Sequence, residues 1–87
     1  MSSKHARTLR EVFTDPTKAN IEWDSIEKML KHYGAHLEER AGSRVAVDAS
    51  GVRAIFHRPH PQKEAKRSLV RAVREFCEEA GIEPEDT

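Results

Sequence analysis

Hydrophobic residues recur at the spacing of an α-helix in three parts of the chain. The first part, residues 4–13, predicts a short helix that ends before the Asp15–Pro16 pair, because proline disfavours helical geometry in the preceding residue. The second part predicts a helix that begins at Asp24, which forms a capping box with Glu27. This helix ends at Gly34, which favours the left-handed conformation of a helix end. Its apolar face carries Ile26, Met29, Leu30 and Tyr33.

The third part lies near the C-terminus and predicts a longer helix. Its apolar stripe consists of Ala65, Leu69, Val73, Phe76 and Ala80. Gly81 ends the helix, and Ile82 is placed to fold back in a Schellman contact. Two starts stay open at this point: Pro61 at the first helical position, or Ser68 as the N-cap.

Between these helices the pattern changes to the alternation of β-strands. Residues 35–40 predict an edge strand, and residues 44–49 a strand with alternate apolar positions. The Ser50–Gly51 pair predicts a two-residue hairpin loop that leads into a third strand at residues 52–57. Prolines end this strand, because proline donates no hydrogen bond to a sheet. The predicted order is α–α–β–β–β–α, an α+β fold with two layers, in which a three-stranded antiparallel sheet is covered on one face by the two longer helices.

Composition adds limits to this picture. At 87 residues, with 34% charged and 37% hydrophobic residues, the chain suits one small folded domain with a modest core. The single Cys77 excludes an intramolecular disulfide and a cysteine-based zinc cluster. The sequence has no apolar run of membrane-spanning length and no apolar segment typical of a secretory signal, so we expect a cytoplasmic protein that does not contact a membrane.

The charges are segregated, although the net charge is zero. Residues 53–74 hold seven bases and one acid, a sum of +6, whereas residues 75–87 hold six acids and no base, a sum of −6. The helix dipole favours the reverse order along a helix, so it does not explain this arrangement. The pattern predicts a basic face for an anionic partner, followed by an acidic tail. The alternative is two ordinary solvated helix faces.

A series of short motifs gives the chain a family resemblance. They are the helix IEKMLKHYG, the Gly42–Ser43 pair, the segment FHRPHP, the Lys63–Glu64 pair and the closing SLVRAVREFCEEAGI. In this order the chain resembles the HicA family, the toxin half of HicA–HicB toxin–antitoxin pairs. The resemblance implies a fold similar to double-stranded-RNA-binding domains. It also implies an RNA-cleaving toxin that blocks translation and is silenced by a HicB antitoxin.

The resemblance divides the chain into three parts. Residues 1–20 form an N-terminal helical extension, residues 21–82 form the HicA-like domain, and residues 83–87 form the acidic tail. We expect the extension to cap the core, and the alternative is that it contacts a partner. The family's catalytic histidine follows the glycine–serine pair, where this chain has Arg44 and Val45. Neither is a general base near neutral pH. Either another histidine has taken the role, or the protein is a module that binds RNA or protein without cleaving. The oligomeric state stays open.

His57 and His60 are the candidates for proton transfer. Metal-independent RNA cleavage needs a base, an acid and a cation, and histidine suits the first two roles because its ordinary pKa lies near neutral pH. Both residues flank Arg58 at the end of the third strand, beside the strand that carries Arg44. The alternative is that both are polar residues of a strand end. The spacing indicates no third ligand for zinc, and we expect no cofactor.

Arginine and lysine residues supply the predicted contacts to RNA phosphate. They are Arg44, Arg53, Arg58, Lys63, Lys66, Arg67, Arg71 and Arg74. On a continuous helix, residues 63, 67, 71 and 74 would form one basic stripe, which suits the phosphates of an A-form groove. The same stripe also suits an acidic surface of an antitoxin. Trp23, Tyr33, Phe56 and Phe76 are expected in the core rather than stacked on bases.

Overall fold

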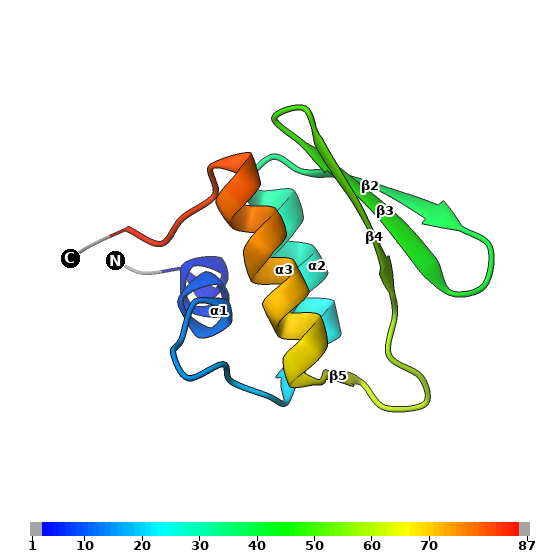
Figure 1. Cartoon of the computed structure of the whole chain (residues 1–87), viewed down its shortest axis with the longest axis horizontal. Helices are drawn as coiled ribbons and strands as arrows, with labels where there is room; N and C mark the ends of the chain where they lie inside the picture. The colour runs from blue at the N-terminus through cyan, green and yellow to red at the C-terminus, as the bar shows by residue number, and fades with distance from the viewer. Residues whose placement is uncertain (1–2, 86–87) are drawn as a thin grey trace.

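Two helices pack against one face of an antiparallel sheet, and a third helix lies on the far side of this pair (Figure 1). In this computed structural model residues 3–85 are described. The helices are α1 (Lys4–Val12), α2 (Trp23–His32) and α3 (Arg67–Ala80). The sheet has the order β2 (His36–Arg40), β3 (Arg44–Ala49) and β4 (Val52–His57), and the short strands β1 (Ile21–Glu22) and β5 (Glu64–Ala65) pair with each other. The predicted α+β class and the order of helices and of the three main strands are confirmed.

The ends of the chain lie partly outside this description. Residues 1 and 2 of the predicted extension and residues 86 and 87 of the predicted acidic tail are among the residues that are not described. Within residues 3–85, no helix has both the length and the apolar character needed to cross a membrane.

The sheet confirms the predicted hairpin. Ala49 pairs with Val52, so Ser50 and Gly51 form a two-residue loop, with φ angles of 52° and 78°. Positive φ at both positions is the requirement of a type I′ turn, whose twist matches that of the flanking strands. β3 is the central strand, and β2 is an edge strand as predicted.

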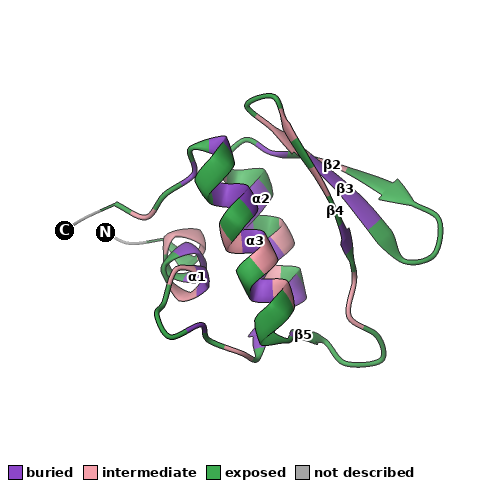
Figure 2. Cartoon of the chain, in the orientation of Figure 1, coloured by how far each residue is buried: buried purple, intermediate pink, exposed green. Residues whose placement is uncertain are grey.

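The core lies between the sheet and the helices (Figure 2). Ile26, Met29 and Leu30 of α2 are fully buried, as the apolar spacing predicts. Phe56 of β4 packs edge-on against Trp23 and against Phe76, with ring centroids 5.8 and 6.1 Å apart. These three aromatic residues are buried, which confirms their expected place in the core.

The predicted capping box of α2 is wrong. The helix begins at Trp23, its N-cap is Glu22, and no side chain caps it. The cause is the β1–β5 ladder, which pairs Glu22 with Glu64 and keeps the chain extended up to Glu22. The Trp23 amide then donates to the carbonyl of Lys63. The side chain of Glu27 is used elsewhere, where it accepts a hydrogen bond from the Trp23 indole.

Both predicted starts of α3 are also wrong. The helix begins at Arg67 after an uncapped Lys66, because Ala65 belongs to strand β5. The buried face of α3 is therefore rotated from the predicted stripe: Val70 and Cys77 are fully buried, whereas Leu69 is half-buried. At the other end, the Ile82 amide donates to the carbonyl of Cys77 over 2.8 Å after Gly81 at φ +77°, which confirms the Schellman contact.

The N-terminal helix α1 completes the core as expected. Leu9 and Val12 are buried against α2 and α3, on the side of the helix layer away from the sheet (Figure 1). Two arginines of α3 hold the loop that follows: Arg67 donates to the Thr17 carbonyl over 3.2 Å, and Arg74 donates to the Thr17 hydroxyl.

Candidate functional site

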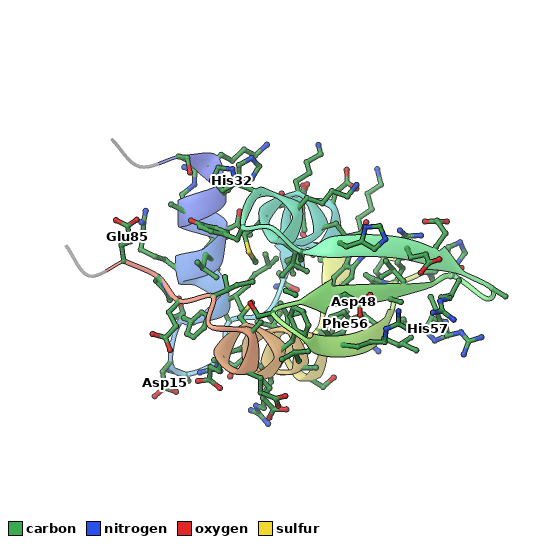
Figure 3. The ribbon with its side chains drawn as sticks, turned by 90° about the horizontal axis from the view of Figure 1, so that it is seen from above. Asp15, His32, Asp48, Phe56, His57 and Glu85 are labelled. Carbon is green, nitrogen blue, oxygen red and sulfur yellow. The ribbon has the colours of Figure 1, made fainter. Side chains whose placement is uncertain are left out.

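The outer face of the sheet is not covered by a helix, and one end of this face is basic. The register pairs Arg40 with Arg44, and Arg44 with His57, so one residue of each strand forms a row across the sheet. Directly paired residues point to the same face, and all three are exposed. His57 lies toward the end of the sheet that is remote from α1 (Figure 3). Two guanidinium groups and an imidazole thus share one end of the open face.

The turn between β2 and β3 is joined to the segment FHRPHP, residues 56–61, which we call the histidine–proline segment. Gly42 and Ser43 have φ angles of 74° and 62°, and the Arg58 amide donates to the Ser43 carbonyl over 2.9 Å. Arg44 donates from Nε to the carbonyl of Ala41, also over 2.9 Å. The glycine–serine pair and the histidine–proline segment are far apart in sequence, and these contacts bring them together.

Arg58 anchors the histidine–proline segment to the rest of the fold. Its guanidinium donates two hydrogen bonds to the Glu27 carboxylate, over 2.6 and 3.2 Å, and forms an ion pair with Glu39. The hydrogen bonds that the guanidinium donates to Glu27 raise the pKa of Arg58, so its charge is permanent. Because Glu27 also binds the Trp23 indole, one partly buried network joins α2, β2 and the end of β4.

Two hollows lie on the two sides of residues 58–62. The first, which we call the β4–α3 groove, has a volume of about 680 Å³ and lies between β4 and the first turns of α3. His57, His60 and Lys66 line it. The second has a volume of about 490 Å³ and lies toward the start of α2, where His60 and Lys63 contribute. His60 therefore borders both hollows, and His57 borders the groove and the basic row.

The eight predicted phosphate contacts fall into two groups. Arg53 donates to Asp48 over 2.8 Å and lowers the pKa of that carboxyl group. Together with Arg58, Arg67 and Arg74, it is held by contacts within the chain. The other four are exposed, and within residues 3–85 no ion pair engages them, although Arg44 donates to the Ala41 carbonyl: Arg44, Lys63, Lys66 and Arg71. Lys63 precedes α3, so the predicted stripe is not continuous on one helix.

Sequence reasoning missed Glu27 and Glu39. The sequence pattern places Glu27 in a capping box and gives Glu39 no role. Their role depends on an arginine that is 31 residues away from Glu27 in the sequence, and no local pattern carries that information. The only available signal was the placement of Glu27 one turn after Trp23, which lets the indole and the carboxylate meet.

Chemically, the site combines titratable imidazoles with fixed positive charge. Histidine exchanges protons near neutral pH, whereas arginine and lysine hold phosphate. Among the described residues, no group of three histidine, cysteine or acidic side chains is arranged to hold a metal ion. The arrangement suits general acid–base chemistry on a phosphodiester.

The fold and the site define a class: a small α+β domain with one open sheet face and histidines at the sheet end. The family model described as "HicA toxin of bacterial toxin-antitoxin" matches residues 23–82, which is 60 of the 87 residues. The chain therefore belongs to the HicA toxin family, whose members are the toxins of toxin–antitoxin pairs. The comparisons with curated proteins and with solved structures gave no significant match.

Proposed function

We propose that this protein is an endoribonuclease toxin that binds and cleaves messenger RNA in the cytoplasm and is neutralised by a HicB-type antitoxin. The observation that supports cleavage is the pairing of His57 with Arg44 across the sheet. Arg44 occupies the position after the glycine–serine pair, and its direct neighbour supplies the imidazole that this position lacks. The surface that contacts RNA belongs to residues 21–82, and α1 packs against the far side of α2 and α3.

His57 and His60 share the proton transfers in this proposal. One imidazole removes the proton of the ribose 2′-hydroxyl, whose oxygen attacks the adjacent phosphorus. The other protonates the departing 5′-oxygen, so the products are a cyclic 2′,3′-phosphate and a free 5′-hydroxyl. Arg44 stabilises the negative charge that gathers on the phosphate oxygens. No metal ion takes part.

Phosphates farther along the RNA meet the exposed cations. Lys63, Lys66 and Arg71 lie on the loop before α3 and on its first turns, next to the histidines. Arg53, Arg58, Arg67 and Arg74 add to the positive potential while they keep their contacts within the chain. Binding of this kind weakens as the salt concentration rises.

Cleavage of a long RNA by the purified protein tests the proposal. We expect cleavage that persists in EDTA and is lost in both His57→Ala and His60→Ala. His36→Ala is the matched control, because His36 is an exposed histidine on the distant edge strand β2. Cleavage that disappears with EDTA, or that survives in both variants, would contradict the assignment.

The second candidate is a module that binds RNA or protein without cleaving. Arg44 and Val45 at the position of the family's catalytic histidine favour it. In this case the purified protein binds RNA and leaves it intact, and its induction without a partner does not stop growth. The toxin instead arrests growth, and co-expression of the antitoxin restores it.

A further inference from the structure

The β4–α3 groove has one apolar side, which phosphate binding does not explain. Ile55 of β4 is 52% exposed and is the large hydrophobic residue most exposed to solvent in the described part of the chain. It lines the groove together with Leu69 and Ala72 of α3, which are half-buried. An exposed apolar surface that is continuous with a groove suggests that a ligand covers it.

The other side of the groove is polar and basic. His57, His60 and Lys66 line it together with Gln62 and Ser68, and no aspartate or glutamate is among its lining residues. Arg58 also borders the groove, but Glu27 and Glu39 already neutralise its guanidinium. The charge of the groove therefore suits an anion that also has an apolar surface.

A nucleotide in a single strand has these two properties, whereas a duplex does not. In an A-form helix the bases are stacked inside, and a protein meets mainly the phosphates and the 2′-hydroxyl groups. An unpaired base exposes an apolar face that stacks on protein side chains, and its phosphate remains beside it. The volume of about 680 Å³ lies in the range of small-molecule pockets and leaves room for one nucleotide with its flanking phosphates.

We infer that the β4–α3 groove binds one unstacked nucleotide of single-stranded RNA, with the base against Ile55 and Leu69 and the phosphate beside Lys66 and the histidines. This inference rests on the proposed function and deepens it. It places the scissile phosphate next to His57, because the groove and the basic row share that residue. It also gives the protein a preference for single strands, in contrast to the double-stranded binding that the fold resemblance implies.

The first test compares a labelled single-stranded RNA with a blunt duplex of the same sequence. Both are titrated at low salt, with binding followed by fluorescence anisotropy, against the wild-type protein, Ile55→Thr and Leu69→Gln. Ile55→Thr keeps a β-branched residue on the strand, and His36→Thr is its control at an exposed strand position outside the groove. Circular dichroism and the unfolding midpoint verify that each variant folds.

We expect the wild type to bind the single strand more tightly than the duplex. Ile55→Thr and Leu69→Gln weaken single-strand binding by about tenfold, the effect expected when one base loses its stacking surface. The affinity of these two variants for the duplex changes less than twofold. The affinity of the His36→Thr control for the single strand also changes less than twofold. In the wild type, the methyl resonances of Ile55 and Leu69 shift when the single strand is added.

Three outcomes would overturn the inference. If both RNAs bind with equal affinity and Ile55→Thr changes neither affinity, the groove does not bind a base. The proposed RNA cleavage is not contradicted by this result. If Ile55→Thr leaves RNA binding intact but prevents assembly with the antitoxin, the groove is a protein interface. If the pure protein binds neither RNA, the proposed function fails together with the inference.

Discussion

At the scale of a single residue, Arg58 joins parts of the fold that are distant in sequence. Its guanidinium binds Glu27 of α2 and Glu39 of β2, while its backbone lies directly after β4, within the histidine–proline segment. Glu27 is only 13% exposed, so its carboxylate depends on this partner. The contact positions His57 and His60 relative to the sheet.

We predict that Arg58→Ala lowers the free energy of unfolding by about 1.5–3 kcal/mol, because it leaves a partly buried carboxylate without its charged donor. Arg58→Lys recovers only part of the lost free energy of unfolding, since a lysine does not form the planar bidentate contact of an arginine. Urea unfolding measures the change. Arg53→Ala, which breaks an exposed pair with Asp48, is the control and leaves the midpoint nearly unchanged. Equal losses in both variants would contradict the prediction.

Cys77 gives a second prediction at this scale. Burial, followed by the nearby carboxylate of Glu78, raises the pKa of the thiol from 9.0 to about 12. At pH 8 the thiolate fraction of the native protein is therefore about a thousandfold below that of the unfolded chain, and alkylation is slow until the protein unfolds. The unfolded chain loses this proton first, so stability falls as the pH rises from 9 to 12. Rapid labelling of Cys77 in the folded protein by iodoacetamide would contradict the predicted slow alkylation.

At the scale of the elements, α1 is the described helix that lies outside the family match. Its apolar spacing was sufficient to predict the helix, because Leu9 and Val12 fall on one face. Its attachment was not predictable. Arg67 and Arg74 were assigned to RNA, but their contacts to Thr17 depend on how α1 sits against α3, which no local pattern encodes. The starts of α2 and α3 differ from the prediction for a related reason, since the β1–β5 ladder pairs residues 42 and 44 positions apart.

We predict that Leu9→Ala lowers the free energy of unfolding by about 2–5 kcal/mol, the usual cost of a cavity in a core. Leu9 is 1% exposed and packs in the same cluster as the core residues of α2 and α3. Arg10→Ala, an exposed change on the same helix, is the control and stays within about 0.5 kcal/mol of the wild type. Denaturation followed by circular dichroism gives both values. A Leu9→Ala protein as stable as the control would show that α1 is dispensable.

At the scale of the whole molecule, one hydrophobic core joins the sheet, the helices α2 and α3, and α1. The alternation of residues 44–57 predicted the sheet correctly, because a turn and two strands are local features. The site was less accessible to prediction. His57 and Arg44 were placed on neighbouring strands, but the groove, its apolar side and the network of Arg58 arise only when β4 and α3 pack together.

We therefore predict a single cooperative unfolding transition. The fluorescence of Trp23, which lies between the layers, reports on the core, and α1 is followed by NMR signals of Leu9 and Val12. Because these residues share one cluster, both probes give the same urea midpoint. A lower midpoint for α1 would show that the extension unfolds separately.

The position of α1 also determines whether a tag or a fused protein at a terminus covers the candidate site. The described chain begins at α1 and ends after α3, on the side of the helices that faces away from the sheet (Figure 1). A tag or a solid support fixed at either terminus thus leaves the sheet end and the groove accessible. A protein fused to either terminus and meant to reach the sheet end has to cross much of the 39 Å length of the molecule. That distance requires a linker of about a dozen extended residues, and a shorter one keeps the fused protein away from the sheet end.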